Sequence, residues 1–456
     1  MYSNLLRDIY TSFKRNNEKR TLKALNNILM SIIFKSIRIT ISFILVPISI
    51  DYLNPTVYGV WMTIFSVFMW VQILDIGLGN GLRNRLAEAL AKNDIYIARV
   101  YVSTAYFILT VLMLIVFSIF VLIYPFIKWG KLFNVSITLW PQVNKTVLIV
   151  FSFVCLNFIF QLIIRICQAK QEPAYREIID AFSAILLLIL IFLLYKFTLS
   201  SLTYYATATC ISYTLTFIVF SFILFKTKYK DCIPNLHFVN LRYTKDLLKL
   251  GINFFIIQSA SVVLFSTDNF LISYLASPEQ VTVVNIAKKY FNIIFIGFLT
   301  ILSPLWSAVT DAFNKGDLFW VKRAVNKLTK LWGIVAVCIT LMLILSNDFY
   351  YLWIRNRVRV PFSISFIIAI LVLLRTFGAI FTHIINGLGF LRIQMIDTII
   401  GMILNIPFSI FLAKYLKLGA AGVILSTVII VFIGVILRVI QYHKIINNTA
   451  RGLWIK

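Results

Sequence analysis

The sequence predicts an all-α polytopic membrane protein with about twelve transmembrane helices. The chain has 456 residues, of which 60% are hydrophobic and 13% are charged, and its mean hydropathy is +0.91. A water-soluble fold of this size would have too little polar surface to cover its interior. Twelve apolar runs also follow one another along the chain, each close to the roughly 20 residues that a helix needs to cross a bilayer.

The apolar runs form two sets of six, separated by a polar and basic segment. The first set lies near residues 28–50, 58–78, 97–124, 146–168, 177–197 and 203–225. The second set lies near residues 250–275, 281–307, 330–353, 361–386, 395–415 and 419–441. This division predicts a basic N-terminal segment, a first lobe, a linker, a second lobe and a tail, at 1–27, 28–225, 226–249, 250–441 and 442–456.

The distribution of lysine and arginine predicts the orientation. Of the 43 basic residues, 29 lie in the N-terminal segment, in alternate connections and at the carboxyl terminus, nine lie in the other connections, and five lie within apolar runs. Because basic residues stay on the cytoplasmic side, both termini are expected there. The first 27 residues are too long and polar for a signal peptide's n-region, so the first helix is expected to direct the chain to the membrane.

Several function classes are disfavoured. The net charge of +26 lies in short connections between helices, which favours contact with anionic headgroups over nucleic-acid binding. The five cysteines and three histidines show no metal-ligand spacing, and no phosphate-binding loop is present. We therefore expect no metal, no cofactor and no disulfide, and any energy must come from ion gradients, the membrane potential or consumption of a product.

The chain repeats itself across its midpoint. Pro55 opens one apolar run, and Asp94 ends "EALAKND" 39 residues later; Pro278 opens another run, and Asp317 ends "DAFNKGD" after the same interval. The offset between the two copies is 223 residues. Farther along, "EPAYREIIDAF" aligns with "GFLRIQMIDTI" at an offset of 217.

The second match places Asp180 opposite Asp397. Six helices separate the copies, so both halves enter the membrane from the same side. This is a parallel repeat about an axis along the membrane normal, an arrangement that transporters use with a substrate site between two lobes.

The stretch from Tyr58 to Asp94, "YGVWMTIFSVFMWVQILDIGLGNGLRNRLAEALAKND", resembles the Wzx-like polysaccharide flippases of the multidrug/oligosaccharidyl-lipid/polysaccharide (MOP) exporter superfamily. A weaker match is "INGLGFLRIQMID" at 385–397. The resemblance implies two six-helix bundles related by a pseudo-two-fold axis along the membrane normal, a MATE-like fold. It also assigns a family motif and cytoplasmic gate to Tyr58, Gly59, Asp75, Gly77, Gly79, Arg83 and Asp94.

The resemblance further implies a function. Such a flippase moves an undecaprenyl-diphosphate-linked O-antigen or capsule unit from the cytoplasmic to the periplasmic leaflet of the bacterial inner membrane by alternating access. Its partners would be this lipid-linked oligosaccharide and the bilayer, with a polysaccharide polymerase and a chain-length regulator as further candidates.

Charged residues within the apolar runs are the candidate binding residues. Lys35 and Arg38 lie about 10 and 15 Å into the first predicted helix, and Arg375 lies about 20 Å into the tenth. Lys288 and Lys289 lie in the eighth. Cations at this depth usually face a wet cavity, and a surplus of them suits an anionic diphosphate. For Lys288 and Lys289, the alternative is that the side chains extend along the helix to the headgroups.

Asp268 is the clearest deep acid, and both a proton-coupling role and a counter-ion role are open for it. Two other functions compete with a flippase. One is an ion-coupled drug or small-solute exporter of the same superfamily, which is expected to carry surplus acids. The other is a membrane polymerase or glycosyltransferase acting on the same lipid carrier, which is expected to carry a large external loop. The longest external connection here is near 125–145, so we expect no enzyme.

Overall fold

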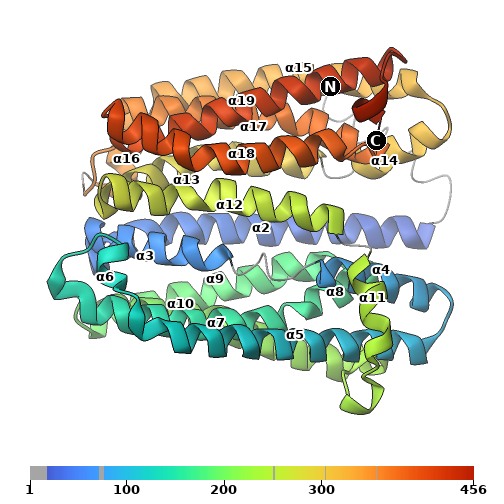
Figure 1. Cartoon of the computed structure of the whole chain (residues 1–456), viewed down its shortest axis with the longest axis horizontal. Helices are drawn as coiled ribbons and strands as arrows, with labels where there is room; N and C mark the ends of the chain where they lie inside the picture. Colours follow the sequence, from blue (N-terminus) through green and yellow to red (C-terminus); the bar gives the residue numbers. More distant parts are fainter. Residues whose placement is uncertain (1–17, 71–76, 250–251, 303–304, 356, 456) are drawn as a thin grey trace.

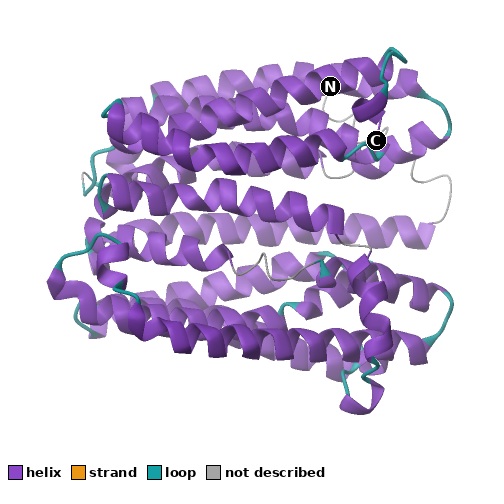
Figure 2. Ribbon diagram, viewed as in Figure 1, coloured by secondary structure: helices purple, strands orange, loops and turns teal. Residues whose placement is uncertain are grey.

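The computed structural model describes residues 18–70, 77–249, 252–302, 305–355 and 357–455. All regular secondary structure in these ranges is helical (Figures 1 and 2). The first half contains α2 (Glu18–Leu53), α3 (Pro55–Phe68), α4 (Leu78–Ala91), α5 (Ile95–Ile123), α6 (Trp129–Leu132), α7 (Trp140–Phe160), α8 (Leu162–Ala169), α9 (Ala174–Phe197) and α10 (Leu202–Thr227). The fold is thus the all-α class that the composition predicts.

The second half begins with the linker helix α11 (Thr244–Lys249). It continues with α12 (Ile252–Leu275), α13 (Pro278–Leu302), α14 (Leu305–Asn314), α15 (Leu318–Ile344), α16 (Ser346–Ile354), α17 (Phe362–Leu388), α18 (Arg392–Ile410), the π-helical turn η7 (Phe411–Tyr415), α19 (Gly419–Ile446) and the short helix η8 (Gly452–Ile455).

Ten helical segments within the described ranges are long and apolar enough to cross a membrane. They include α2, α5, α7 with α8, α9, α10, α13, α15, α17, α18 with η7, and α19. Of the other two expected spans, 58–78 coincides with the short apolar helix α3 and with residues outside the description, and 250–275 coincides with α12. The chain is therefore a multi-pass membrane protein, and the number of twelve stays a prediction.

The helices of each half pack mainly with one another. In Figure 1 the helices before the linker fill one half of the molecule and those after it fill the other. Neighbouring pairs recur at matching places: α2 packs on α9 as α12 packs on α18, and α10 packs on α7 as α19 packs on α17. We call the end with α4, α8, α11 and α14 the α4 end, and the end with α6 and α16 the α6 end.

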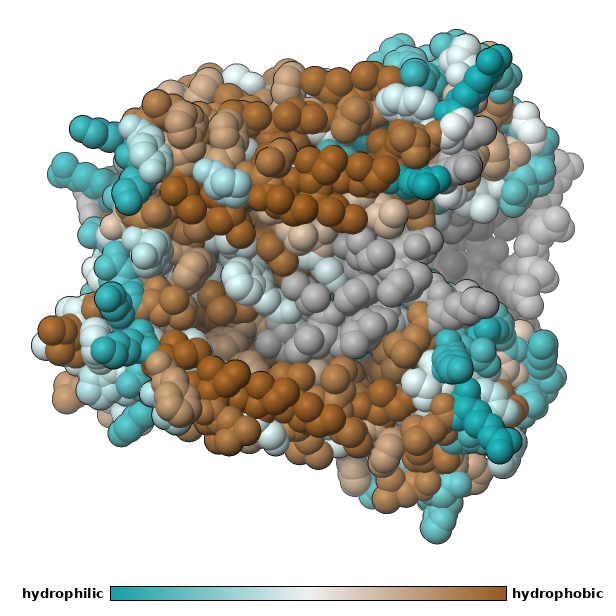
Figure 3. All heavy atoms as spheres, in the orientation of Figure 1, coloured by the Kyte–Doolittle hydropathy of each residue, from teal (hydrophilic) through white to brown (hydrophobic). Residues whose placement is uncertain are grey.

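Apolar side chains form a belt across the middle of the face seen in Figure 3, and hydrophilic side chains gather at the two ends of this face. Large apolar side chains on this belt are exposed, including Ile400 on α18 and Ile433 on α19. Since lipid is as apolar as these side chains, their exposure carries no penalty in a bilayer.

The two aspartates of the sequence repeat each cap the start of a helix. Asp94 caps the start of α5 by accepting a hydrogen bond from the amide of Ile97, and Asp317 caps α15 by accepting one from Trp320, both at 2.9 Å. Such a cap satisfies one of the unpaired amides at a helix start. The residue before each aspartate has a positive φ, 56° at Asn93 and 73° at Gly316.

The halves meet most closely where α3 crosses α13. Both helices begin at the prolines of the repeat, as expected for a residue with no amide to donate. The hydroxyl of Thr282 donates to the carbonyl oxygen of Pro55 over 2.6 Å. In the reciprocal position, a methyl group added to Gly59 would lie 1.7 Å from the carbonyl oxygen of Pro278. Glycine is thus required at 59 by the close approach of two backbones.

We expect Gly59→Ala to destabilise the protein. The new methyl group collides with main chain that cannot rotate away, so the helices must separate, and overpacking of this kind costs about 1–3 kcal/mol or more. Thermal unfolding in detergent measures the change. Gly333→Ala in α15 is the matched control, because a methyl group there meets nothing within 4 Å. Equal unfolding temperatures for the two variants would contradict the crossing described here.

Candidate functional site

The first group of intramembrane charges joins α2 to α9. Arg38 contacts Asp180 over 3.0 Å and Glu177 over 3.5 Å. Arg176, one turn before Asp180 on α9, contacts the same carboxylate over 3.4 Å. Because a charge in the membrane interior is costly unless it is paired, this cluster fixes α2 against α9. Arg38 is therefore engaged by two carboxylates of its own half.

Two lysines connect the halves at the contact between α2 and α13. Lys35 donates to the hydroxyl of Thr300 over 2.9 Å, and Lys289 donates to the carbonyl oxygen of Ser42 over 2.7 Å. The first ammonium group comes from the N-terminal half and the second from the C-terminal half. Each lysine therefore reaches across to a polar atom of the opposite half.

A buried polar network surrounds Asp268, whose exposed fraction is 1%. Its carboxylate accepts from Lys288 over 2.8 Å and from the hydroxyl of Thr427 over 3.0 Å. The side-chain amide of Asn405 in turn donates to Thr427 over 3.0 Å. The network joins α12, α13, α18 and α19 through hydrogen bonds and one ion pair, and hydrogen-bonded networks of this kind favour one packing of these helices.

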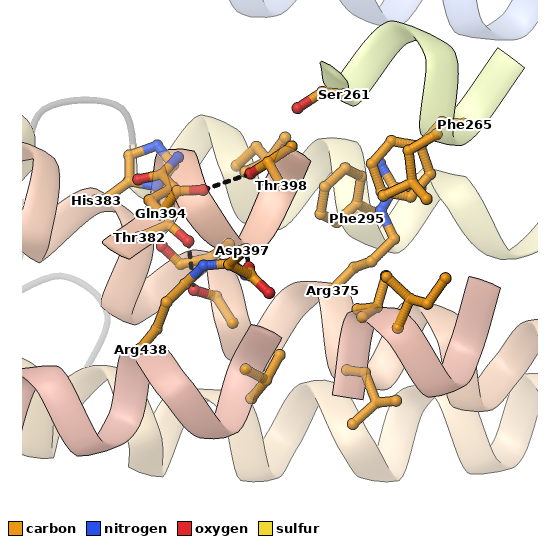
Figure 4. Close-up of a pocket in the computed structure, with 18 residues that line it drawn as sticks. Ser261, Phe265, Phe295, Arg375, Thr382, His383, Gln394, Asp397, Thr398 and Arg438 are labelled. Carbon is orange, nitrogen blue, oxygen red and sulfur yellow. Dashed lines mark hydrogen bonds and ion pairs between the residues drawn. The ribbon is translucent and has the colours of Figure 1, made fainter. Parts of the chain in front are cut away.

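A cavity of 240 Å³ lies inside the C-terminal half, between α12, α13, α17, α18 and α19. We call it the Arg375 cavity (Figure 4). One side of it is aromatic and holds Arg375 with Phe265 and Phe295. The other side is polar, and its labelled residues are Thr382, His383, Gln394, Asp397, Thr398 and Arg438. This combination of an apolar wall and a few convergent polar groups is typical of a ligand site.

Arg375 is held by aromatic rings. Its guanidinium carbon lies 4.0 Å from the ring centre of Phe295 and 4.7 Å from that of Phe265. Within the described ranges no carboxylate or carbonyl group hydrogen-bonds to it. Ring contacts orient a guanidinium group and leave its N–H groups available, so Arg375 presents a fork of donors suited to a phosphate or carboxylate.

The polar side of the cavity ends at an ion pair. Arg438 on α19 contacts Asp397 on α18 over 2.8 Å. A methyl group added to Gly434 would lie 2.5 Å from this carboxylate, so glycine makes room for the pair. Arg438 falls in the predicted apolar run 419–441 but is not among the predicted binding residues, and the structure places it partly buried within α19. The alignment of Asp180 with Asp397 is the sequence signal that points to this place.

The five predicted cations do not form one cluster. Arg38 lies with α9, Lys35 and Lys289 lie between the halves, Lys288 lies on Asp268, and Arg375 lies in its own cavity. The sequence reasoning missed Glu177, Arg438 and the two phenylalanines. The two phenylalanines gave a weak sequence signal, because aromatic residues are frequent throughout these helices.

The residues of the family motif are divided between the two ends. Tyr58 and Gly59 lie on α3 near the α6 end, and Tyr58 is buried. The others lie at the α4 end: Gly77 precedes α4 with a φ of 77°, Gly79 and Arg83 lie on α4, and Asp94 caps α5. Asp75 lies outside the described residues. The motif therefore does not lie at a single end of the molecule.

Comparisons with known proteins agree with this architecture. Residues 24–308 match the family described as polysaccharide biosynthesis protein. The "Putative O-antigen transporter" of Salmonella typhimurium is 24% identical over 399 residues, which cover 83% of this chain and 87% of that one. The "Putative O-antigen export protein" of Yersinia pseudotuberculosis is also 24% identical, covering 69% of this chain and 71% of the relative.

Solved structures with a similar fold are multidrug transporters of the MATE family. The inward-facing structure of a MATE transporter of the MOP superfamily superposes with a TM-score of 0.74 at 17% identity, covering 92% of this chain and 98% of that one. An outward-facing structure gives a TM-score of 0.64 at 16% identity, covering 95% and 97%. The expected all-α membrane fold with MATE-like neighbours is confirmed, and its division into two six-helix bundles stays a prediction.

We expect the Asp268–Lys288 pair to be strongly coupled in stability. Asp268→Asn leaves the partly buried ammonium group of Lys288 without its counter-ion, and breaking a buried pair costs about 3–5 kcal/mol. Lys288→Met should destabilise for the same reason, and the double variant should be more stable than either single one. Thermal unfolding of the four proteins measures the coupling. Additive losses would show that the two charges act independently, and unchanged stability of the Asp268→Asn protein would contradict the counter-ion role of Asp268.

Proposed function

Since the chain belongs to the polysaccharide biosynthesis protein family, we propose that it is a flippase for a lipid-linked oligosaccharide. In this proposal it moves an O-antigen or capsule unit on an undecaprenyl diphosphate carrier across the bacterial inner membrane. The relatives named as O-antigen transporter and export protein support this class of cargo. The chain then acts as a transporter rather than as an enzyme, with both termini in the cytoplasm and the α4 end facing the same side.

The observation that carries the proposal is the state of Arg375. It is a cation that lines a cavity inside the helix bundle and whose guanidinium group lies against two aromatic rings. A diphosphate is the charged part of such a cargo, and guanidinium binds its oxygens through two parallel hydrogen bonds. The same site disfavours a cationic drug, since Arg375 would repel it.

Contacts between the halves support an alternating-access mechanism. At the α6 end, Arg357 forms an ion pair with Asp51 at the end of α2. The indole nitrogen of Trp353 on α16 donates to the carbonyl oxygen of Phe43 over 2.9 Å. The hydroxyl of Ser273 on α12 donates to the carbonyl oxygen of Phe133 beside α6 over 2.9 Å. These contacts tie the halves together at the α6 end, so export in this proposal requires them to separate and re-form once per cycle.

We expect Arg375→Ala to abolish surface polysaccharide while the protein remains in the membrane at normal abundance. Arg375→Lys should restore part of it, because the charge survives but the two-pronged geometry is lost. Arg323→Ala is the matched control: this arginine also stacks on a phenylalanine, Phe319, over 4.6 Å, but it is exposed at the α4 end. Surface polysaccharide is measured by labelling intact cells. Normal display by the Arg375→Ala cells would exclude the proposed role.

A cleavable crosslink across the α6 end should stop export. In a protein whose five natural cysteines are replaced, Asp51→Cys and Arg357→Cys place one thiol on each half. A membrane-impermeant bis-thiol reagent should join them from outside and halt surface display, and reduction should restore it. Cysteines replacing Asp311 and Lys315, which pair at the end of α14, are the control, because this pair lies at the α4 end and the reagent should not reach it from outside. Export that continues in crosslinked protein would contradict alternating access, and labelling only from the cytoplasm would reverse the orientation.

A further inference from the structure

A second, apolar groove lies on the outside of the same wall that bounds the Arg375 cavity. It has a volume of 340 Å³ and lies between α18 and α19. Its lining includes Ile396, Ile400 and Leu404 from α18 and Ile433 from α19. These side chains are 37% to 52% exposed and belong to the apolar belt of the molecule. In a membrane the groove is therefore open to the lipid.

Only a thin wall separates the groove from the Arg375 cavity. Asp397 and Ile430 line both spaces. Two glycines reduce the thickness of the wall here, since a methyl group on Gly401 would lie 2.8 Å from Ile430 and one on Gly434 would lie 2.5 Å from Asp397. The charged part of the wall is the Asp397–Arg438 pair. The Asp397–Arg438 pair therefore lies between a lipid in the groove and the Arg375 cavity.

The groove ends near the α4 end, beside the C-terminal segment. Leu453 and Trp454 of η8 line it, and the carbonyl oxygen of Trp454 accepts a hydrogen bond from Gln441 over 3.2 Å. The ammonium group of Lys444 lies 4.2 Å from the indole ring centre. A tryptophan beside a lysine is typical of the membrane–water interface. Asp397 lies two turns or less from the start of α18, so the groove begins at the depth where lipid headgroups meet acyl chains.

We propose that this groove binds the polyprenyl chain of the lipid-linked cargo next to its diphosphate, and that the diphosphate enters the Arg375 cavity between α18 and α19. This inference rests on the proposed flippase function. The diphosphate first contacts Arg438, whose guanidinium group leaves the Asp397 carboxylate and binds the diphosphate oxygens. It then contacts Arg375. A groove bounded by two helices accepts one chain, whereas a phospholipid brings two chains on one glycerol.

Photo-crosslinking in vesicles tests the proposal directly. A benzophenone amino acid replaces Ile400 in the groove, and in a separate protein it replaces Val337, an exposed apolar residue of α15 outside the groove. Each protein is placed in vesicles of phosphatidylethanolamine and phosphatidylglycerol that contain a trace of radiolabelled polyprenyl diphosphate. We expect the label to be enriched about tenfold at position 400 over position 337, as for one charge-assisted hydrogen bond. Equal labelling, or attachment of phospholipid alone at position 400, would overturn the proposal.

The role of the ion pair is tested with the same probe. Arg438→Gln should remove the enrichment of polyprenyl diphosphate at position 400. An uncharged polyprenol should crosslink at position 400 equally with and without the Arg438→Gln change. Because this change leaves Asp397 without its partner, the neutral double variant Asp397→Asn, Arg438→Gln is included, and it should lose the same enrichment while folding normally. Retention of the enrichment in the double variant would exclude Arg438 as a diphosphate contact.

Failure of this inference is distinguishable from failure of the proposed function. Crosslinking measures binding and requires no transport. If cells still depend on the protein for surface polysaccharide but position 400 shows no enrichment, only the groove is excluded. If cells display polysaccharide without the protein, the flippase function is excluded whatever the crosslinks show.

Discussion

The cost of an unpaired charge in the membrane interior governs the arrangement of these helices. Each buried carboxylate described here joins one helix to a neighbour: Asp180 joins α9 to α2, Asp268 joins α12 to α13, and Asp397 joins α18 to α19. Between apolar helices in lipid there is little hydrophobic driving force, so these pairs select which faces meet. Arg375 departs from this pattern, since aromatic rings rather than a carboxylate hold it. In the proposed function, an anion from outside the chain binds at this position.

Much of the fold could be predicted from local sequence, and most of the site could not. Pro55, Pro278, Asp94 and Asp317 act at helix starts because their chemistry is local, so the repeat they define recurs in the structure. Ion pairs depend on contacts between distant segments. Arg38 and Asp180 are 142 residues apart, and no local pattern connects them. Arg438 lies near the predicted end of the last apolar run at residue 441, where polar residues such as Gln441 and His443 follow it, whereas α19 extends to Ile446.

The two halves neutralise their equivalent carboxylates with arginines from different helices. At the offset of 223, Arg38 on α2 corresponds to Ser261 on α12. At the offset of 217, Arg438 on α19 corresponds to Ser221 on α10. The first helix of each half thus carries arginine in one half and serine in the other, and the last helix carries them the other way round. The aspartate is at the equivalent position in both halves. The net charge around each aspartate is preserved, but the volume that the arginine occupies has moved from an inner helix to an outer one.

This exchange gives the two aspartates different surroundings. In the N-terminal half the long side chain of Arg38 reaches from α2 to two carboxylates of α9. In the C-terminal half the short side chain of Ser261 lines the Arg375 cavity. The arginine that pairs with Asp397 there is Arg438, which comes from α19. The Arg375 cavity and the ion pair at its polar side therefore lie at a position where the two halves of the repeat carry different side chains.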